Sequence, residues 1–445
     1  MNPNEAWWQS TTISNKPSFS IRYKNLFFFL STHSKSCPIF LFKIPLFFQQ
    51  QLPSLPGSHR FGKPAWLTPL LSTVEFTIKK YFHQWGLLQL LDFAKHFNNM
   101  FIHWEAIGAL IEIWHPQTHT FIFSSFEATI LIEETELLLG LKDNRAKNKP
   151  VAHSMVKSSG QELMFKLTEN HAQARNIASQ RGIRLSILAK WIMKAKGQGI
   201  DHEGIAQALS LCLAGLFYFP KHDDFLDEEF LGPIQGAWHG RSLAQPILAH
   251  LYSGLSSACL GKPFHGSVIL LDNWLSFHMK IGFSADTKTK SCNRSPIFRL
   301  EYALHCSDQM IIKTPNIRTR DQWRSFINKL LPRDFFLSSK ALPKLKTRPY
   351  AGIDLRLVGS KELVLYNAHR CHLQLQQPRH MVPPLSHYQP IELRIFESYH
   401  DQVDVRTCLE LWKINDAQAT DAEMEEDKEL VKAYTARVQQ LKSLQ

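Results

Sequence analysis

The chain has 445 residues, of which 44% are hydrophobic, so a buried core can extend over most of its length. That length is enough for two or three domains, or for one large domain with appendages. The seven cysteines are odd in number and include no Cys-x-x-Cys pair, which excludes a disulfide framework and favours reduced thiols in the cytosol or nucleus.

The formal net charge of +12 is unevenly distributed along the chain. Residues 280–379 contain 19 Lys and Arg against 7 Asp and Glu, an excess equal to that of the whole chain. Residues 413–445 contain 5 basic and 7 acidic residues. A basic segment of this kind is the usual electrostatic mark of a polyanionic partner, and a solvated basic surface is the alternative.

Residues 1–69 are predicted to form a poorly ordered N-terminal extension. Their apolar stretch, residues 26–48, is rich in Phe, but two Lys and two Pro interrupt it. It therefore never reaches the roughly 18–20 apolar residues that a membrane-spanning helix needs. The stretch also starts too late for a signal peptide and lacks a small-residue cleavage site. We do not expect membrane insertion through 26–48.

Two helices are predicted between Val74 and Pro116. Apolar residues recur at steps of three and four from Val74 to residue 97, which is the period of one helix face. Gly86 interrupts or bends this helix. The same spacing predicts a second helix from Trp104 to Trp114. Pro116 ends it, because proline donates no backbone hydrogen bond and disfavours helix in the residue before it.

The next elements are a short strand and a series of helices. Residues 118–123 are β-branched and aromatic, which predicts a strand. Residues 132–139 predict a helix with acids in its first turn and Gly140 after its last turn. Prolines break residues 288–348 into short elements, and 221–229, KHDDFLDEE, is predicted to be a link. Further helices are predicted at residues 185–196, 205–219, 243–260, 267–278 and 423–444.

These patterns predict a fold that is mainly α with a few short β-strands. We expect a single large helical domain over residues 70–395. A flexible N-terminal extension (residues 1–69) precedes it, and a C-terminal helical tail (residues 396–445) follows it.

Residues 114–141, WHPQTHTFIFSSFEATILIEETELLLGL, carry the most specific pattern in the chain. The segment resembles the plant mobile domain, a transposon-derived family that is often labelled aminotransferase-like. Segments similar to later parts of the family follow in order, among them ALSLCLAGLFYFP at 208–220 and VLYNAHRCHLQLQQPRHMVP at 364–383. The resemblance covers residues 70–395. It implies a nuclear role in chromatin, transposon silencing or meristem maintenance.

The motif departs from the family pattern at three positions. Phe126 stands where the family has glycine, and Leu131 replaces the threonine that caps the following helix. Thr135 stands where an apolar residue is customary. Loss of a cap typically costs about 1 kcal/mol, and a buried hydroxyl adds to that cost. We therefore expect a weakened start to this helix.

The aminotransferase-like label implies pyridoxal phosphate, but the residues for it are missing. Such an enzyme needs a Schiff-base lysine and a Gly-rich phosphate cup, whereas no Gly-rich turn surrounds a lysine here. We predict no transaminase activity and no cofactor.

Candidate metal ligands are present but poorly arranged. His115 and His119 are four residues apart, but Pro116 breaks the helical geometry that would bring them together. The spacing of a second group, His369, Cys371, His372 and Cys306, is no known zinc pattern. A nuclease would need carboxylates converging on two metal ions. Asp223, Asp224, Asp272 and Glu301 are available for this, but nothing in their spacing fixes a geometry. The motif acids Glu127, Glu133 and Glu134 are interpreted as a helix N-terminus and a solvated link. We predict no metal site.

The candidate nucleic-acid site lies in RTRDQWRSF (318–326) and LPKLKTRPY (342–350). Basic residues next to an aromatic ring are suited to phosphate contacts and base stacking. Against stacking, Trp323 and Phe326 are spaced as in the core face of an amphipathic helix. The predicted binding residues are Arg318, Arg320, Trp323, Arg324, Lys344, Lys346 and Arg348.

The function favoured by the sequence is that of a non-enzymatic, transposon-derived nuclear protein, with a cytoplasmic location as the alternative. Nucleic acid or chromatin is expected to contact residues 280–379, and a protein partner the C-terminal helix. No small-molecule substrate is identified. Two other functions remain open. One is a degenerate element-encoded, metal-dependent nuclease or transposase. The other is a protein-interaction scaffold.

Overall fold

The computed structural model places two groups of helices, each built around one helix that is buried over most of its length. It describes residues 64–97, 102–116, 118–124, 126–141, 159–195, 201–221, 223–259, 262–279, 317–331, 335, 355–358, 362–366 and 391–392. All of these lie in one compact unit, Lys43–Gln445. The apolar stretch 26–48 and the predicted C-terminal tail 396–445 lie outside the described residues.

The described chain begins with four helices. They are α3 (Leu67–Leu71), α4 (Phe76–Trp85), α5 (Leu88–His96) and α6 (Trp104–Ile111). The helix predicted from Val74 to residue 97 is thus two helices. Gly86 lies between them with φ 73°, a left-handed conformation that glycine adopts without strain, and its N–H donates to carbonyls of the last turn of α4.

The motif segment forms a three-stranded antiparallel sheet followed by a helix. The elements are β1 (Trp114–His115), β2 (Thr120–Ile122), β3 (Glu127–Ala128) and α7 (Ile132–Leu138). The predicted strand and helix are confirmed. The prediction that Trp114 continues the preceding helix is wrong, because it pairs with Phe121 across the sheet. Gly140 follows α7 with φ 60°, as its position after the last turn predicted.

The middle of the chain contains two predicted helices together with several elements that the sequence patterns did not reveal. In order they are α8 (Gly160–Thr168), α9 (His171–Ile177), β4 (Ala178–Ser179), β5 (Gly182–Arg184), α10 (Leu185–Ala195), α11 (His202–Phe217), β6 (Phe225–Asp227), the 3₁₀ turn η5 (Glu228–Phe230) and α12 (Leu231–Trp238). Of these, α10 and α11 were predicted. Strands β4, β5 and β6 form a second antiparallel sheet, and β6 lies inside the predicted link 221–229.

The last described elements are two long helices, one short helix and a third sheet. They are α13 (Ala244–Cys259), α14 (Val268–Met279), α15 (Arg320–Lys329), β7 (Leu355–Val358), β8 (Glu362–Tyr366) and β9 (Ile391–Glu392). Strand β8 pairs antiparallel with both β7 and β9. No helix in these described ranges is long and apolar enough to cross a membrane. The prediction of a mainly helical fold with a few short strands is confirmed.

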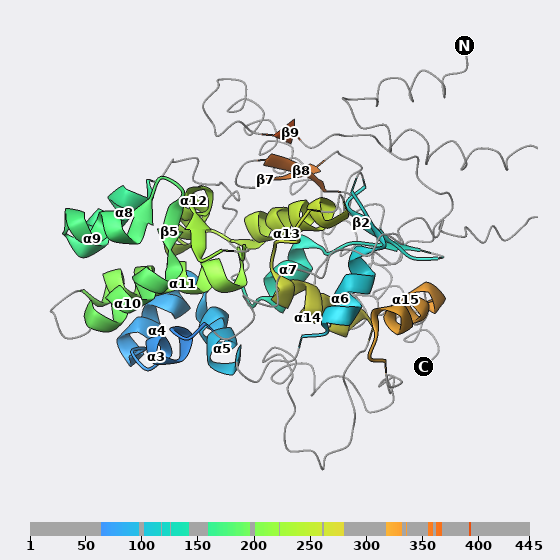
Figure 1. Ribbon diagram of the computed structural model, residues 1–445, viewed down its shortest axis with the longest axis horizontal. Helices are drawn as coiled ribbons and strands as arrows, with labels where there is room; N and C mark the ends of the chain where they lie inside the picture. The colour runs from blue at the N-terminus through green and yellow to red at the C-terminus, as the bar shows by residue number, and fades with distance from the viewer. Residues whose placement is uncertain are drawn as a thin grey trace, which may run out of the picture. The chain divides into compact units, whose positions relative to one another are not determined.

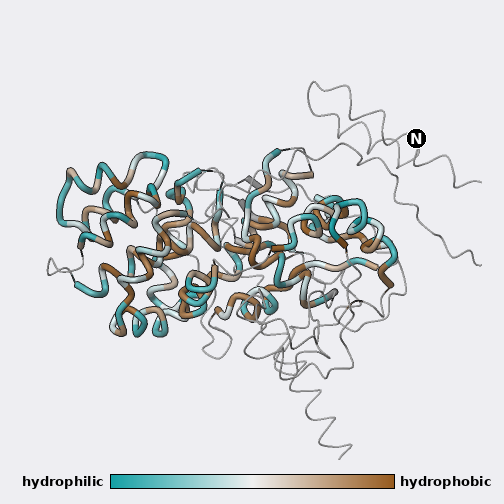
Figure 2. Tube along the Cα trace, turned by 60° about the horizontal axis from the view of Figure 1, so that its bottom comes forward, coloured by the Kyte–Doolittle hydropathy of each residue, from teal (hydrophilic) through white to brown (hydrophobic). Residues whose placement is uncertain are grey.

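Helices α11 and α13 are the centres of the two groups (Figure 1). Every residue of α11 from Ala208 to Phe217 is buried, and the helix contacts α4, α5, α10 and α12. Helix α13 is buried from Ala244 to Tyr252 and contacts α6, α7, β1 and the β7–β8 hairpin. A helix that is apolar on all sides must be covered all round, so these two are enclosed by the rest. Figure 2 shows the hydrophobic stretches of the chain passing between hydrophilic outer turns.

Gly254 in α13 and Gly204 in α11 provide a matched test of this packing. A Cβ atom on Gly254 would fall on the backbone carbonyl of His265, whereas one on Gly204 would meet only Leu167 Cδ2 at 3.7 Å. We expect Gly254→Ala to lower the free energy of unfolding by about 3 kcal/mol or more, because backbone must shift. Gly204→Ala should leave it unchanged or raise it by up to about 1 kcal/mol. Urea unfolding measures both, and equal stabilities would contradict the close approach at Gly254.

Candidate functional site

The polar side chains of the motif strand bond to one another inside the protein. Thr118 Oγ1 lies 2.8 Å from Thr120 Oγ1, and Thr120 Oγ1 donates to Glu127 Oε2 at 3.3 Å. The Thr118 N–H donates to His115 Nδ1 at 3.3 Å. Thr118, in the turn before β2, and the strand residues Thr120 and Glu127 are all buried. Buried polar groups need such partners, and here the segment supplies them locally.

His119 joins the motif to the third sheet. It lies in the turn between β1 and β2 with φ 52°, and its side chain is buried. Its Nδ1–H donates to the Leu365 carbonyl at 2.7 Å, and its ring stacks on Trp114 with centroids 5.9 Å apart. Burial lowers the pKa of His119 to about 4, although the hydrogen bond to Leu365 opposes this shift. The ring is thus held neutral as a structural contact between β1–β2 and β8.

Glu134 is a buried acid of the motif with several hydrogen-bond partners. The side chain is 1% exposed, and its Oε1 lies 2.8 Å from His278 Nε2. Its Oε2 accepts hydrogen bonds from Trp274 Nε1 at 3.1 Å and from the Leu131 N–H at 2.9 Å. The His278 ring is stacked on Phe335, with centroids 4.5 Å apart. This carboxylate therefore connects the start of α7 with two positions of α14.

The burial of Glu134 corrects one interpretation of the motif acids. Glu127, Glu133 and Glu134 are all buried, so the expected solvated link is wrong. The expected helix N-terminus is correct for Glu134, whose carboxylate accepts the free N–H of Leu131. The acids lie inward because their partners come from the sheet and from α14, which local sequence does not reveal.

The same contacts offset the missing threonine cap at Leu131. Besides the bond from Leu131 N–H to Glu134, the Ile132 N–H donates to the Tyr366 hydroxyl at 3.0 Å. The Thr135 hydroxyl donates to the Leu131 carbonyl at 3.0 Å, so it is not an unsatisfied polar group. Two of the N–H groups at the start of α7 are thus satisfied by side chains other than a cap. These hydrogen bonds replace those of the missing cap, and the weakened helix start stays a prediction.

The acids considered for a nuclease take part in separate contacts. Asp223 pairs with Arg181, and Asp224 accepts a hydrogen bond from the Ser186 N–H at 3.1 Å. Asp272 accepts from the His103 N–H at 3.0 Å and lies 3.1 Å from its ring Nδ1. Glu301 and the group His369, Cys371, His372 and Cys306 lie outside the described residues. Among the residues that are described, no three His, Cys, Asp or Glu side chains are grouped to hold a metal ion.

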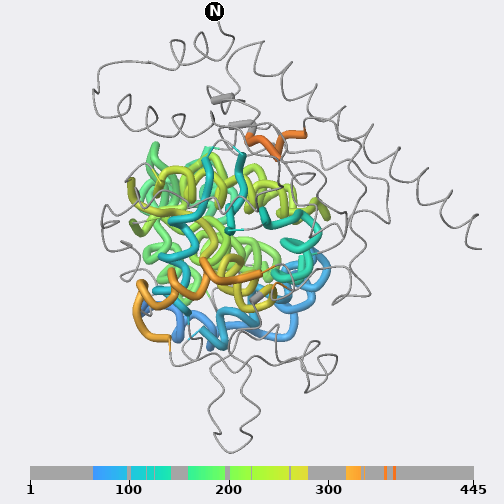
Figure 3. Tube along the Cα trace, turned by 90° about the vertical axis from the view of Figure 1, so that its right-hand side faces the viewer, coloured from blue at the N-terminus to red at the C-terminus, as the bar shows by residue number. Residues whose placement is uncertain are grey.

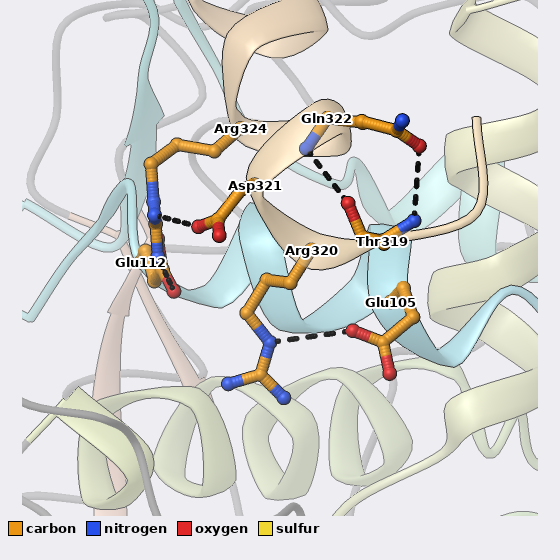
Figure 4. Close-up of polar contacts among 7 residues, drawn as sticks. All are labelled: Glu105, Glu112, Thr319, Arg320, Asp321, Gln322 and Arg324. Atoms are coloured by element: carbon orange, nitrogen blue, oxygen red, sulfur yellow. Dashed lines mark hydrogen bonds and ion pairs between the residues drawn. The ribbon is translucent and has the colours of Figure 1, made fainter.

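Helix α15 carries three of the seven predicted nucleic-acid residues, Arg320, Trp323 and Arg324, and is docked on α6 (Figures 3 and 4). It begins with a capping box in which the Gln322 N–H donates to Thr319 Oγ1 and the Thr319 N–H donates to Gln322 Oε1. The sequence Thr-Arg-Asp-Gln fits the pattern for this motif, and it would have predicted the helix start.

Two arginines of α15 pair with acids of α6 (Figure 4). Arg324 donates from Nε and Nη2 to the two carboxylate oxygens of Glu112, at 2.6 and 2.8 Å. It also donates to Asp321 at 2.5 Å. The hydrogen bond to Glu112 is the main cause that raises the pKa of Arg324. Arg320 Nε lies 3.7 Å from a Glu105 oxygen. Both guanidinium groups are therefore engaged by carboxylates 212 and 215 positions away in the sequence.

Trp323 is 4% exposed and packs in the hydrophobic core. Its ring meets His103 edge to face at 6.3 Å and Phe326 at 5.7 Å. The burial of Trp323 agrees with the alternative of an amphipathic helix core, and base stacking by this ring stays a prediction. Arg318 is exposed, and its side chain has no carboxylate partner among the described residues. Lys344, Lys346 and Arg348 lie outside them, so binding through this region stays a prediction.

The pKa of His119 makes stability depend on pH in a definite direction. The unfolded chain takes up a proton at this histidine near pH 6.5, whereas the folded protein does so only near pH 4. Its contribution to stability is therefore lost as the pH falls through this window, by up to about 3 kcal/mol. We expect His119→Asn, which tolerates positive φ, to be less stable at pH 7 but to lose less stability on acidification. Unfolding by urea at pH 7 and pH 4 measures this, and parallel losses would contradict it.

The two arginine pairs of α15 should differ in strength. Arg324 and Glu112 form a bidentate pair whose carboxylate side chain is 8% exposed, whereas Glu105 is 48% exposed. A double-mutant cycle with Arg324→Gln and Glu112→Gln should give a coupling energy of about 1–3 kcal/mol. The matched cycle with Arg320→Gln and Glu105→Gln should give less than about 1 kcal/mol. Hydrogen exchange of the α15 amides reports both, and equal couplings would contradict the geometry.

A search of curated proteins returns no match, and a search of solved structures also returns none. The family called plant mobile domain matches residues 92–388, which is more than half of the chain. The matched residues contain the motif sheet, α7, the Glu134–His278 pair, α15 and the β7–β8 hairpin. The chain therefore belongs to the plant mobile domain family.

Proposed function

We propose that this protein is a non-enzymatic nuclear protein that contacts nucleic acid or chromatin through the basic segment 280–379, in transposon silencing or meristem maintenance. The observation that carries this proposal is the concentration of positive charge, 19 Lys and Arg against 7 Asp and Glu, in one segment. Lysine and arginine side chains bind nucleic acid by replacing counterions on its phosphates, which needs no catalytic geometry.

The arrangement of α15 narrows the residues that carry the contact. Arg320 and Arg324 already pair with Glu105 and Glu112, so their charge is partly neutralised. Arg318 is exposed and precedes the helix. The cationic contacts are therefore assigned to Arg318, Lys344, Lys346 and Arg348.

The role of the polar motif residues also favours a binding protein over an enzyme. His119, Glu127 and Glu134 are each buried and hydrogen-bonded to other parts of the fold. A catalytic acid or base must instead reach a substrate. In this proposal the protein descends from a transposon-encoded protein but no longer cleaves DNA.

Binding of duplex DNA by the full-length protein tests the proposal. Affinity should fall linearly on a log–log plot against salt, with a slope near roughly −0.9 per phosphate neutralised. The triple change Lys344→Gln, Lys346→Gln and Arg348→Gln should flatten that slope by roughly two to three units, and Arg318→Gln alone by about one. Fluorescence anisotropy over a salt series gives both values.

The matched control removes three charges elsewhere: Lys80→Gln, Lys95→Gln and Lys262→Gln, all at exposed positions. If this control flattens the slope as much as the triple change, the segment 280–379 has no special role. Absence of salt-dependent binding to any DNA or RNA would favour the scaffold alternative. Cleavage of the DNA that requires a divalent metal would favour the nuclease alternative.

A further inference from the structure

A second concentration of positive charge lies earlier in the chain. Residues 142–196 contain 12 Lys and Arg against 3 Asp and Glu, an excess of +9 in a segment shorter than 280–379. The remaining residues of the chain are therefore net acidic. The charge of the chain is thus concentrated in two separate basic segments rather than one.

The described part of this earlier segment folds into one group of packed elements, which we call the basic lobe (residues 159–195). It consists of α8, α9, β4, β5 and α10, which contact one another in sequence order and are green in Figure 1. All six of its basic residues are exposed: Lys166, Arg175, Arg181, Arg184, Lys190 and Lys194. Arg181 pairs with Asp223, and the other five have no carboxylate partner among the described residues. This contrasts with α15, where two arginines are engaged by acids.

Two arginines of the lobe share one aromatic ring. The guanidinium carbons of Arg181 and Arg184 lie 5.0 and 5.1 Å from the centroid of the Phe225 ring. Arg184 is paired with Phe225 across β5 and β6. Contact with a ring face restrains a guanidinium group, so less conformational entropy is lost when its planar fork binds a phosphate. Among the described residues no carboxylate pairs with Arg184, so of these two arginines it is the better placed to bind a phosphate.

The lobe also presents lysines at helical spacing. Lys190 and Lys194 are four residues apart on α10. They therefore lie on one face of that helix, where Cβ atoms at this spacing are about 5–6 Å apart. Arg184 therefore lies at the end of strand β5, and the two lysines lie on one face of helix α10, which follows β5 directly in the chain. A polyanion with regularly spaced charges can contact several of them together, as the phosphates of a nucleic acid do.

The lobe lacks the apolar side chains that a membrane-bound surface inserts. Of the large hydrophobic residues exposed in the described chain, only Phe165 belongs to it, and that ring is stacked on His171 at 3.9 Å. We propose that the basic lobe is a second contact surface for the phosphate backbone of nucleic acid, centred on Arg184, Lys190 and Lys194. It shares its partner class with the proposed function but uses different residues.

Salt-dependent binding of duplex DNA by the full-length protein tests this surface. The triple change Arg184→Gln, Lys190→Gln and Lys194→Gln should flatten the salt slope by roughly two to three units. The control is again Lys80→Gln, Lys95→Gln and Lys262→Gln, which removes the same charge. In a protein that carries both the lobe changes and the Lys344, Lys346 and Arg348 changes, the two effects should add.

A second pair of variants tests the ring contact without removing charge. Arg184→Lys keeps the charge but loses the planar fork, and Phe225→Leu keeps an apolar side chain but loses the ring face. Each should weaken binding by about two- to fivefold while leaving the salt slope nearly unchanged. Circular dichroism should show the same helix content in all variants.

The outcomes separate this surface from the proposed one. If only the lobe variant has a flattened salt slope, the lobe binds the nucleic acid and the proposed role of segment 280–379 is wrong. If only the variant in segment 280–379 has a flattened slope, the proposed role of the lobe is wrong. A lobe variant that binds DNA as the control does, but loses binding to vesicles of acidic phospholipid or to polyglutamate, also overturns the nucleic-acid assignment.

Discussion

The buried carboxylate of Glu134 is the constraint on which the family motif depends. An ionised carboxylate is costly to bury unless hydrogen bonds replace its water. Here the donors come from Leu131 at the start of α7 and from Trp274 and His278 on α14. Removing any one donor leaves the remaining charge less compensated, so α7 and α14 are held in one relative position. Helix α13 then fits against α7, and β8 reaches the start of α7 through Tyr366.

These contacts explain why the motif contains polar residues: the residues join separate parts of the fold. From the sequence, His119 is considered as a metal ligand, and Glu127 and Glu134 are interpreted as part of a helix N-terminus and a solvated link. In the structure each has a hydrogen-bond partner within the protein. The motif thus identifies how the sheet β1–β2–β3, α7 and α14 are joined. Binding chemistry has to be sought on the outside of the molecule.

The sequence predicted the elements whose apolar spacing is regular over several turns. Helices α10, α11, α13 and α14 lie where the spacing placed them, and Gly86 and Gly140 follow helix ends. The errors share a physical cause. The burial of Glu134 depends on His278, and the position of His119 depends on Leu365, 246 residues away. Strand β6 is only three residues long, and it pairs with β5 rather than with a sequence neighbour. Local spacing contains no information on such partners.

For the candidate binding residues too, the sequence does not reveal which side chains form pairs in the folded protein. Counting charges treats every arginine alike, but Arg324 is held by two oxygens of Glu112, whereas Arg184 pairs with no carboxylate in the described part of the chain. A cation paired with a carboxylate gains less from a phosphate, because it must first give up that partner. The pairs of α15 are also weakened by salt, since one of their acids, Glu105, is half exposed. Salt therefore acts on two processes in this protein. It weakens the docking of α15 on α6, and it screens any polyanion from the exposed cations. The basic lobe is the simpler surface, because five of its six cations form no ion pair with any residue that the structure describes.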